Sequence, residues 1–362
     1  MTKTQLFELK PDGPDMDIYN EAKKRFDSLA KPIDGFGYFE DLICRVAAIQ
    51  GRLIPDIKKR AVIVMCSDNG VTREGISQTD SKVTLQVARL LGKKESTLGI
   101  LTRGQGIDIV PVDIGIDTDE KISGVIDKKI ARGSADMLEG PAMTEDQCIL
   151  AIQAGIDTVK MCVDKGYTIL ATGEMGIGNT TTSTALLCAL TGDDPKEHTG
   201  RGAGLSDEGL ARKISVINKA LKMHGLEGNP KKEPSGDHAL FALGAVGGFD
   251  IAALCGVFIG CSMFRIPVVI DGLISAVAAL TAQYLVPGCA GSMLASHNGR
   301  EKGTDRILQL LNLKGIINAD MALGEGTGSV MLFPLIDMVM NVYADGHSFE
   351  ETGIREYERF SK

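Results

Sequence analysis

Ala61-Val-Ile-Val-Met-Cys66 is a short and fully apolar run, and the stretch that follows it, Ser67-Asp-Asn-Gly70, is typical of a turn. The same unit recurs at 107–114 before Gly115, at 167–171 before Thr172-Gly173, and at 267–270 before Asp271-Gly272. Helical patterns such as 83–91 and 145–165 lie between these runs. The alternation predicts an α/β fold with a mostly parallel, Rossmann-like sheet that has helices on both faces. Ligands of such folds bind beyond the carboxyl ends of the strands, which is where these Asp and Gly turns lie.

The two ends of the chain have a different pattern of apolar residues, one that is typical of helices. Apolar residues recur at helical spacing in 15–30, in 39–49 and again after residue 331, where Leu335, Ile336, Val339 and Val342 form the pattern. We therefore predict a small helical domain built from 1–55 with 331–362, beside an α/β domain over 56–330.

Charge and composition exclude several classes of function. The chain has 39 Lys and Arg against 47 Asp and Glu, a net charge of −8, which argues against a nucleic-acid partner and a polybasic membrane anchor. The apolar stretches 251–264 and 272–285 are shorter than the about 20 residues that a membrane span needs, and they predict buried helices. Eight cysteines without a CxxC pair, and an N-terminus without a signal-peptide core, favour a cytoplasmic protein.

No metal or cofactor is expected. The five histidines are scattered along the chain, and neither they nor the cysteines have the short spacing of a zinc site. We therefore predict that the protein needs neither a metal ion nor an organic cofactor.

Glycine is the unusual component, at 43 of 362 residues where about 7% is ordinary. Ala171-Thr-Gly-Glu-Met-Gly-Ile-Gly-Asn-Thr-Thr-Thr-Ser183 predicts a strand, a Gly-rich loop and then a helix over 184–190. Such a junction offers free N–H groups to an anion, and we favour a monophosphate site over a simple tight turn with a cap. The loop lacks the lysine of a Walker A motif, and it is not the G-x-G-x-x-G pattern of dinucleotide-binding folds.

A second junction, Gly202-Ala-Gly204-Leu-Ser206, precedes a predicted helix that ends near Gly225. Lys213 lies at the margin of the apolar stripe of that helix. It has two interpretations, a phosphate-binding lysine with a covered stem or a lysine at a solvated edge.

Leu323-Gly-Glu-Gly-Thr-Gly328 places a carboxylate between glycines. From the residues alone, Glu325 is equally an anchored acceptor of backbone hydrogen bonds or a catalytic carboxylate.

Five stretches, taken together, closely resemble the nicotinate-nucleotide–dimethylbenzimidazole phosphoribosyltransferase family, which makes the lower nucleotide of cobamides. They are Gly173-Glu-Met-Gly-Ile-Gly-Asn-Thr-Thr181, Gly202-Ala-Gly204, Gly247-Gly-Phe-Asp-Ile-Ala252, Val269-Ile-Asp-Gly272 and Leu323-Gly-Glu-Gly-Thr-Gly328. The resemblance covers most of the chain, and the stretches follow the order of the family. It implies a dimer and an enzyme that moves phosphoribose from nicotinate mononucleotide to an aromatic base, with inversion and release of nicotinate.

The resemblance also implies roles for individual residues. Glu325 takes the position of the general base and Glu174 that of a second catalytic residue that orients the site. The predicted residues of the nucleotide and phosphate site are Met175, Gly176, Gly178, Asn179, Thr180, Gly202, Gly204, Lys213, Asp271, Ser275 and Ser296. The predicted residues of the base pocket are Ser77, Thr79 and Leu323.

The sequence departs from the family pattern at three places, and the first two concern the acceptor base. The chain has Asp68-Asn69-Gly70 where the family usually has Asp-His-Gly. It has Ser77-Gln78-Thr79-Asp80 where the family often has Ser-x-Tyr-Pro. The Ser-His-x-Ser-x-Glu-x-Gly-His segment survives in part, as 296–304. The alternatives are therefore phenol, p-cresol or adenine as the acceptor, and a heterodimer with a paralogue in place of a homodimer. In that heterodimer the chain would be a weakly active subunit.

Overall fold

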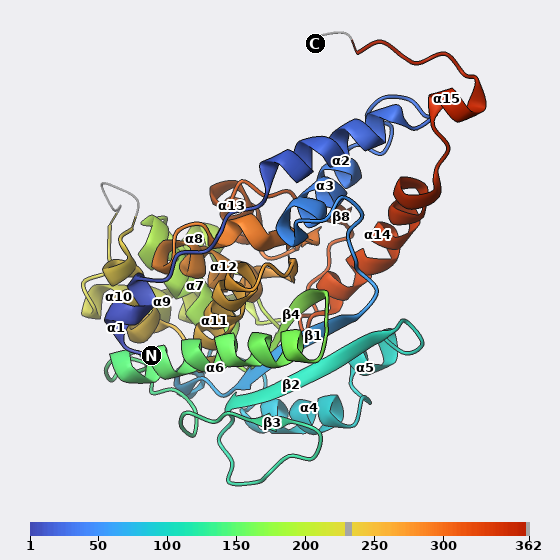
Figure 1. The fold of residues 1–362 in the computed structure, drawn as a ribbon. Coiled ribbons are helices and arrows are strands. Elements are labelled where there is room, and N and C mark those ends of the chain that lie inside the picture. The colour runs from blue at the N-terminus through green and yellow to red at the C-terminus, as the bar shows by residue number, and fades with distance from the viewer. Residues whose placement is uncertain (229–233, 360–362) are drawn as a thin grey trace.

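Six parallel strands form the central sheet of the computed structural model, which describes residues 1–228 and 234–359 (Figure 1). Their order across the sheet is β3-β2-β1-β4-β5-β6. The strands are β1 (Arg60–Ser67), β2 (Ile107–Gly115), β3 (Ile126–Asp127), β4 (Ile169–Met175), β5 (Val268–Ile270) and β6 (Met293–Ala295). A separate parallel pair joins β7 (His297–Asn298) to β8 (Ile317–Asn318). The order reverses between β1 and β4, and ligands of doubly wound folds bind at this kind of switch point.

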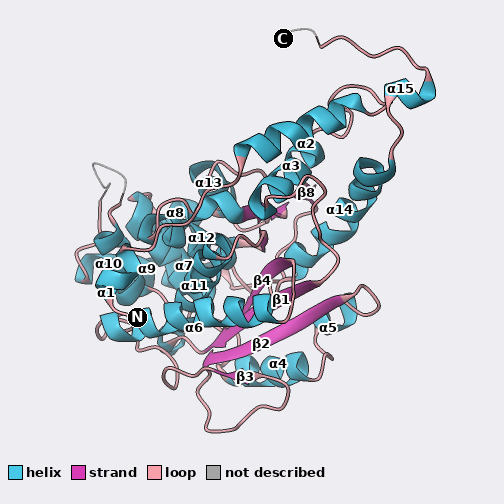
Figure 2. Ribbon diagram, viewed as in Figure 1, coloured by secondary structure: helices cyan, strands magenta, loops and turns pink. Residues whose placement is uncertain are grey.

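Helices make up most of the remaining described structure (Figure 2). The longer helices are α2 (Met16–Ser28), α3 (Tyr38–Gln50), α4 (Lys82–Gly92), α6 (Glu145–Asp164), α7 (Asn179–Thr191), α9 (Asp207–Met223), α10 (Gly236–Val246), α11 (Phe249–Met263), α12 (Leu273–Leu285) and α14 (Thr327–Asp345). The shorter ones are α1 (Lys3–Phe7), α5 (Thr97–Leu101), α8 (Pro195–His198), α13 (Thr304–Leu310) and α15 (Phe349–Thr352), with 3-10 turns at Gly70–Glu74 and Cys289–Ser292.

Alternate side chains of the sheet enter two hydrophobic cores. Ala61, Ile63 and Met65 of β1 pack with residues of α6, α7 and α9 to α12. Val62, Val64 and Cys66 pack with residues of α2 to α5 and of α14. Because successive side chains of a strand point to opposite faces, helices cover both faces of the sheet, and the predicted α/β fold is confirmed.

Helices from both ends of the chain lie side by side (Figure 1). The rings of Phe26 on α2 and Tyr343 on α14 are 4.6 Å apart between centroids, and Arg25 donates to the carbonyl oxygens of Tyr343 and Ala344 at 2.9 and 2.8 Å. These helices share their core with one face of the sheet. The division into domains stays a prediction: its boundary at residue 330 falls inside α14, and 360–362 lie outside the described residues.

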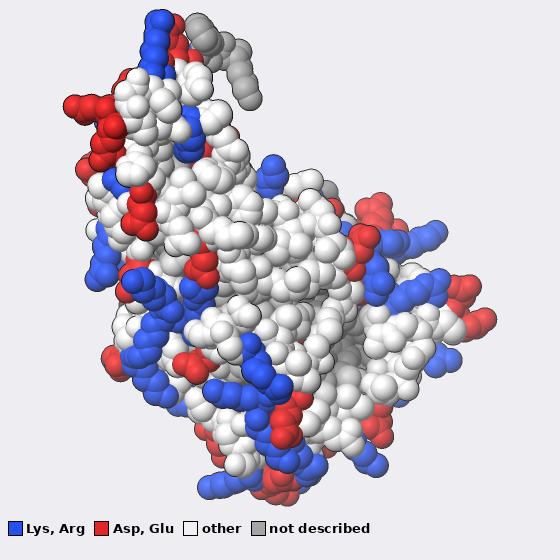
Figure 3. Space-filling model, turned by 90° about the vertical axis from the view of Figure 1, so that its right-hand side faces the viewer, with Lys and Arg blue, Asp and Glu red and all other residues white. Residues whose placement is uncertain are grey.

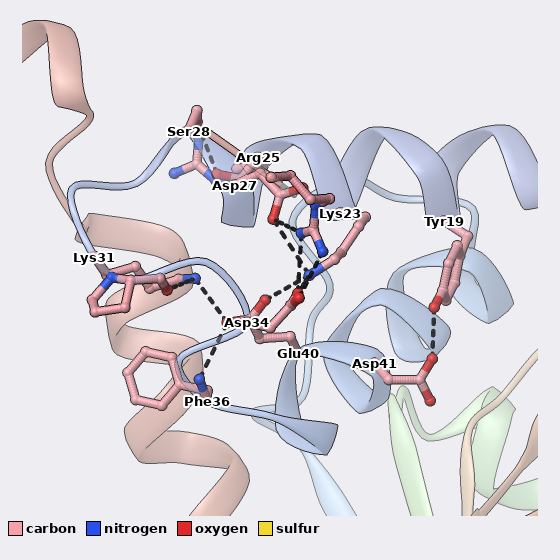
Figure 4. A network of polar contacts seen from close by, with 12 residues as sticks. Tyr19, Lys23, Arg25, Asp27, Ser28, Lys31, Asp34, Phe36, Glu40 and Asp41 are labelled. Atoms are coloured by element: carbon pink, nitrogen blue, oxygen red, sulfur yellow. Dashed lines mark hydrogen bonds and ion pairs between the residues drawn. The ribbon is translucent and has the colours of Figure 1, made fainter. Parts of the chain in front are cut away.

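A network of ion pairs fastens α2 to α3 (Figure 4). Glu40 accepts from Lys23 at 2.8 Å and from Lys31 at 2.7 Å, and Lys23 also reaches Asp34. Arg359 pairs with Asp27 and Asp34 at 2.9 and 2.6 Å. Oxygen atoms of Asp27, Asp34 and Glu40 lie within 4.8 Å of one another, a spacing that could hold a metal ion. The surrounding cations already pair with all three, so the cluster is explained by its salt bridges.

The elements around the Gly-rich stretches differ from the prediction in their bounds. Strand β4 continues to Met175, so Gly173 and Glu174 belong to the sheet and pair with Val64 and Met65 of β1. Helix α7 begins at Asn179 and not at residue 184. Three of its threonines, Thr182, Thr184 and Thr191, fit the helix because their hydroxyls donate to backbone carbonyls about one turn back, as Thr184 does to Thr180 at 2.9 Å.

Helix α14 begins at Thr327, before the predicted start at 331, and Val342, predicted for its apolar stripe, is exposed. Within the described residues, it is the one helix long and apolar enough to cross a membrane by length and composition. More than half of it is buried inside the protein, and Ile336, Val339 and Tyr343 belong to the core on the sheet.

Candidate active site

A cavity of about 310 Å³ opens at the carboxyl ends of β4 and β5. Segments that line it include the end of β4, the start of α7, the loop before α9, the turn after β5 and the loop before α14. The predicted site residues that line it are Ser77, Glu174, Met175, Gly176, Gly178, Asn179, Thr180, Gly202, Lys213, Asp271, Ser275, Leu323 and Glu325. Residues that are far apart in the chain are thus brought to one place.

Three predicted residues lie outside the cavity wall. Ser296 is buried and its hydroxyl donates to the carbonyl oxygen of Ile270 at 2.7 Å, which argues against a direct contact with substrate. Gly204 accepts a hydrogen bond from Gln78, and Thr79 is exposed beside Ser77. The structure therefore places these residues behind or beside the cavity.

The sequence analysis gave no role to several residues that line the cavity or lie behind it. Gln78, Ile177, Arg201, His297, Glu301 and Met321 line it. Asp250 lies behind the wall and is completely buried. The signal for Glu301 and His297 was the partly retained segment 296–304, and Asp250 stands in the quoted stretch 247–252.

Lys213 is almost fully buried, although it lies at the margin of an amphipathic helix. Its ammonium donates to the hydroxyl of Thr180 at 2.8 Å and to the carbonyl oxygen of Gly200 at 3.3 Å. Burial lowers the pKa of Lys213 to about 8, and the carboxylate of Glu301 opposes this shift. A buried ammonium with two neutral acceptors is a strong site for an anion in the cavity.

The start of α7 supports an anion at the same place. Gly178, at φ +96°, is the N-cap residue, and no side chain caps the helix. The N–H of Ile177 is already bound by the hydroxyl of Thr84 at 3.2 Å. The following turn and Lys213 line the same cavity, so the helix dipole and the ammonium would both attract an anion bound there.

Glu174 belongs to a buried chain of polar groups. The amide nitrogen of Asn179 donates to Glu174 and, at 3.0 Å, to Asp250. Burial and the neighbouring carboxylates raise the pKa of Glu174 to about 8, and burial raises that of Asp250 to about 6. Near neutral pH Glu174 is therefore mostly protonated and can donate a hydrogen bond.

Glu325 adopts a left-handed conformation, at φ +58°, between Gly324 at +84° and Gly326 at +89°. Few residues other than glycine adopt this conformation, and strain of this kind concentrates at functional sites. One carboxylate oxygen of Glu325 is buried without a hydrogen-bond partner. Burial raises the pKa of Glu325, the N–H of Leu98 opposes the shift, and Asp271 adds to it. A carboxylate that borders a cavity and keeps one oxygen without a partner is suited to accept a proton from a ligand.

Asp271 and Ser275 are engaged with the protein itself. The carboxylate of Asp271 accepts from the N–H groups of Gly326 at 3.1 Å and Ser329 at 3.0 Å. The hydroxyl of Ser275 lies 2.6 Å from that of Thr172. Both residues border the cavity, yet their described hydrogen bonds hold its walls together.

The remaining wall of the cavity is aliphatic. Ile76, Val83 and Val87 line it from the segment before α4 and from α4 itself, with Ile177 and Leu323 opposite. A flat apolar ring fits between such side chains. The cavity thus combines a buried ammonium, an aliphatic wall and a carboxylate.

The chain is similar in sequence and in fold to known phosphoribosyltransferases. A family model described as phosphoribosyltransferase matches residues 12–354. A protein of Acetivibrio thermocellus named nicotinate-nucleotide–dimethylbenzimidazole phosphoribosyltransferase is 41% identical over 346 residues, 94% of this chain and 96% of its own. A protein of the same name from Clostridium acetobutylicum is 40% identical, over 96% of each chain. The crystal structure of CobT from Thermus thermophilus superposes with a TM-score of 0.87 at 32% identity, and the match covers 94% of this chain and all of that one.

Proposed function

Because this chain belongs to the phosphoribosyltransferase family, we propose that it transfers phosphoribose from nicotinate mononucleotide to 5,6-dimethylbenzimidazole or a similar base. The products are free nicotinate and an α-ribotide for cobamide synthesis. The observation that carries the proposal is the pairing of Lys213 and Glu325 in one cavity, a buried ammonium for the phosphate and an unpartnered carboxylate for the acceptor.

The reaction needs a base but no acid. The bond between C1′ and the nicotinate nitrogen breaks, and its electron pair stays on that nitrogen, which leaves as a neutral pyridine. The unprotonated ring nitrogen of the benzimidazole forms the new bond to C1′ from the opposite side, and the N–H proton of the other ring nitrogen passes to Glu325. Glu174, mostly protonated near neutral pH, would donate a hydrogen bond to the bound sugar and hold it for this displacement.

An assay of nicotinate release tests the function directly. The purified chain is incubated with nicotinate mononucleotide and, in parallel, with 5,6-dimethylbenzimidazole, adenine, phenol or p-cresol. We expect release with the benzimidazole, because the wall of the cavity includes aliphatic side chains that would hold a flat ring by apolar contact. Release only with phenol or p-cresol would replace the proposed acceptor, and no release with any of them would contradict activity of the chain alone.

We also propose that two copies of the chain associate through α14, on the side of the molecule that is largely uncharged in its middle (Figure 3). Met331, Met338 and Val342 are exposed on this helix at helical spacing, and Met338 keeps 60% of its surface. A stripe of this kind on a soluble chain is typical of a protein interface. We place the protein in the cytoplasm, because the eight cysteines are buried free thiols.

Met338→Asp tests the interface, since a charge in the middle of an apolar contact must lose its hydration on association. We expect sedimentation equilibrium to give the mass of two chains for the wild type and of one chain for the variant. Asp345→Asn, at the end of the same helix, is the control and should leave the mass unchanged. A wild type that sediments as a single chain would favour a heterodimer with a paralogue.

A further inference from the structure

We propose that Asp271 is a positioning residue, which holds the carboxylate of Glu325 in place by binding the backbone on the far side of the strained turn. The proposal rests on the proposed function, in which Glu325 is the base. In this proposal Asp271 binds the protein backbone, whereas the sequence predicts that it contacts the nucleotide.

The turn that carries Glu325 needs an external restraint. Three consecutive residues, Gly324, Glu325 and Gly326, have positive φ, and the middle one has a side chain. A left-handed conformation of this kind costs about 1–3 kcal/mol and persists only where the surroundings fix it. Gly326 is the N-cap residue of α14, and no side chain of its own segment caps that helix.

Asp271 supplies the missing cap from another part of the chain. Its two carboxylate oxygens accept from the N–H of Gly326, at 3.1 Å, and from the N–H of Ser329, at 3.0 Å. Gly326 follows Glu325 directly, and Ser329 lies in the first turn of α14. The carboxylate thus satisfies free N–H groups of the helix start and is favoured by its dipole.

The sheet in its turn holds Asp271 in position, and strand β4 packs against the turn that carries Glu325. Asp271 follows β5, and its own N–H donates to the hydroxyl of Ser275 at 3.3 Å. On β4, a Cβ at Gly173 would lie 2.6 Å from the carbonyl group of Glu325, so the turn rests directly on the strand. The hydroxyl of Ser329 donates to the carbonyl oxygen of Thr172 at 3.0 Å. Glu325 is therefore held between the ends of β4 and β5.

Asp271 also affects the pKa of Glu325. Burial is the main cause of the raised pKa of Glu325, and the negative charge of Asp271 adds to it, while the N–H of Leu98 opposes both. The other titratable groups around this cluster are Glu174 on β4, Cys66 on β1 and His297 on β7. Loss of the charge at 271 should thus lower the pKa of Glu325.

Asp271→Asn is the test, because an amide can accept only one of the two N–H bonds and carries no charge. We expect kcat to fall by about 10²-fold, the usual effect of a small misplacement of a reacting group, with a KM for nicotinate mononucleotide within a few-fold of the wild type. We also expect the acidic limb of the kcat profile to move to lower pH. Asp271→Ser, which is uncharged and can accept one bond, should behave alike and serves if the first variant does not fold.

The matched control is Asp337→Ala on the same helix. Asp337 forms a bidentate pair with Arg60 at 2.7 and 3.0 Å, away from the turn, so its loss should destabilise α14 without changing kcat or the acidic limb. If Asp337→Ala lowers kcat as strongly as Asp271→Asn, or if Asp271→Asn raises only KM, the positioning role is wrong. Glu325→Gln separates the two proposals: if that variant keeps normal turnover, the proposed function itself fails.

Discussion

Glu325→Gln should lower turnover by about 10²- to 10⁴-fold, the range that a general base contributes. The amide has the shape of the carboxylate but cannot accept the proton of the acceptor base. Release of nicotinate at saturating concentrations of both substrates measures the effect. Binding of nicotinate mononucleotide should change little, since the base acts on the acceptor.

The same substitution should leave the fold as stable as before or more stable. One oxygen of Glu325 is buried without a partner, and burial disfavours its charged form, so a neutral amide removes an unfavourable group. Urea unfolding checks this expectation. Asp320→Asn is the matched control, because Asp320 lies in the same loop, is exposed and also has positive φ, which asparagine tolerates. Turnover of Glu325→Gln equal to that of this control would refute the catalytic role.

Lys213→Met should raise the KM for nicotinate mononucleotide by roughly 10- to 100-fold, because a hydrogen bond to a charged group contributes about 1.5–3 kcal/mol. Methionine fills the space of the buried stem but has no ammonium for the phosphate. The KM for the acceptor should change far less, since Lys213 lies beside Thr180 and Gly200, in the part of the cavity that we propose for the nucleotide. An unchanged KM for the nucleotide would show that the phosphate binds elsewhere.

The pH dependence gives an independent test of Lys213. Burial lowers its pKa to about 8, and only the protonated form attracts a phosphate. The KM for the nucleotide should therefore rise as pH increases through about 8, and this rise should be absent in Lys213→Met. Lys213→Arg keeps its charge at alkaline pH and should also lose the rise. The protonation of Glu174 changes in the same pH range, but its effect should appear in kcat.

The periodicity and turns of the sequence predicted the α/β class and four of the six strands of the sheet, β1, β2, β4 and β5, whereas the short strands β3 and β6 were not predicted. Each apolar run that ends in an Asp or Gly turn is a strand of the parallel sheet, because such a run can be buried on both faces. The resemblance located the loops of the site, and thirteen of the sixteen predicted site residues line one cavity. Their roles stay predictions until the substitutions are measured.

The exact ends of the strands and the hydrogen-bond partners of buried residues could not be predicted from the sequence, for physical reasons. Strand β4 runs two residues past the predicted Thr172-Gly173 ending because its ladder with β1 outweighs the low strand propensity of Gly173. Asp250 received no role from the sequence, and its bond to Asn179 spans 71 positions of the chain. No local pattern reports a contact of that length.

The sequence by itself determined the parallel α/β architecture, the Gly-rich loops and the identity of the residues in them, since these follow from local periodicity and short motifs. The tertiary structure alone decided whether Lys213 was buried and which groups Asp271 binds. It also decided that Glu325 keeps an unpartnered oxygen in the cavity. Burial and charge depend on which segments meet in space, and in this fold the segments that meet at the cavity are spread along the chain between residues 76 and 327.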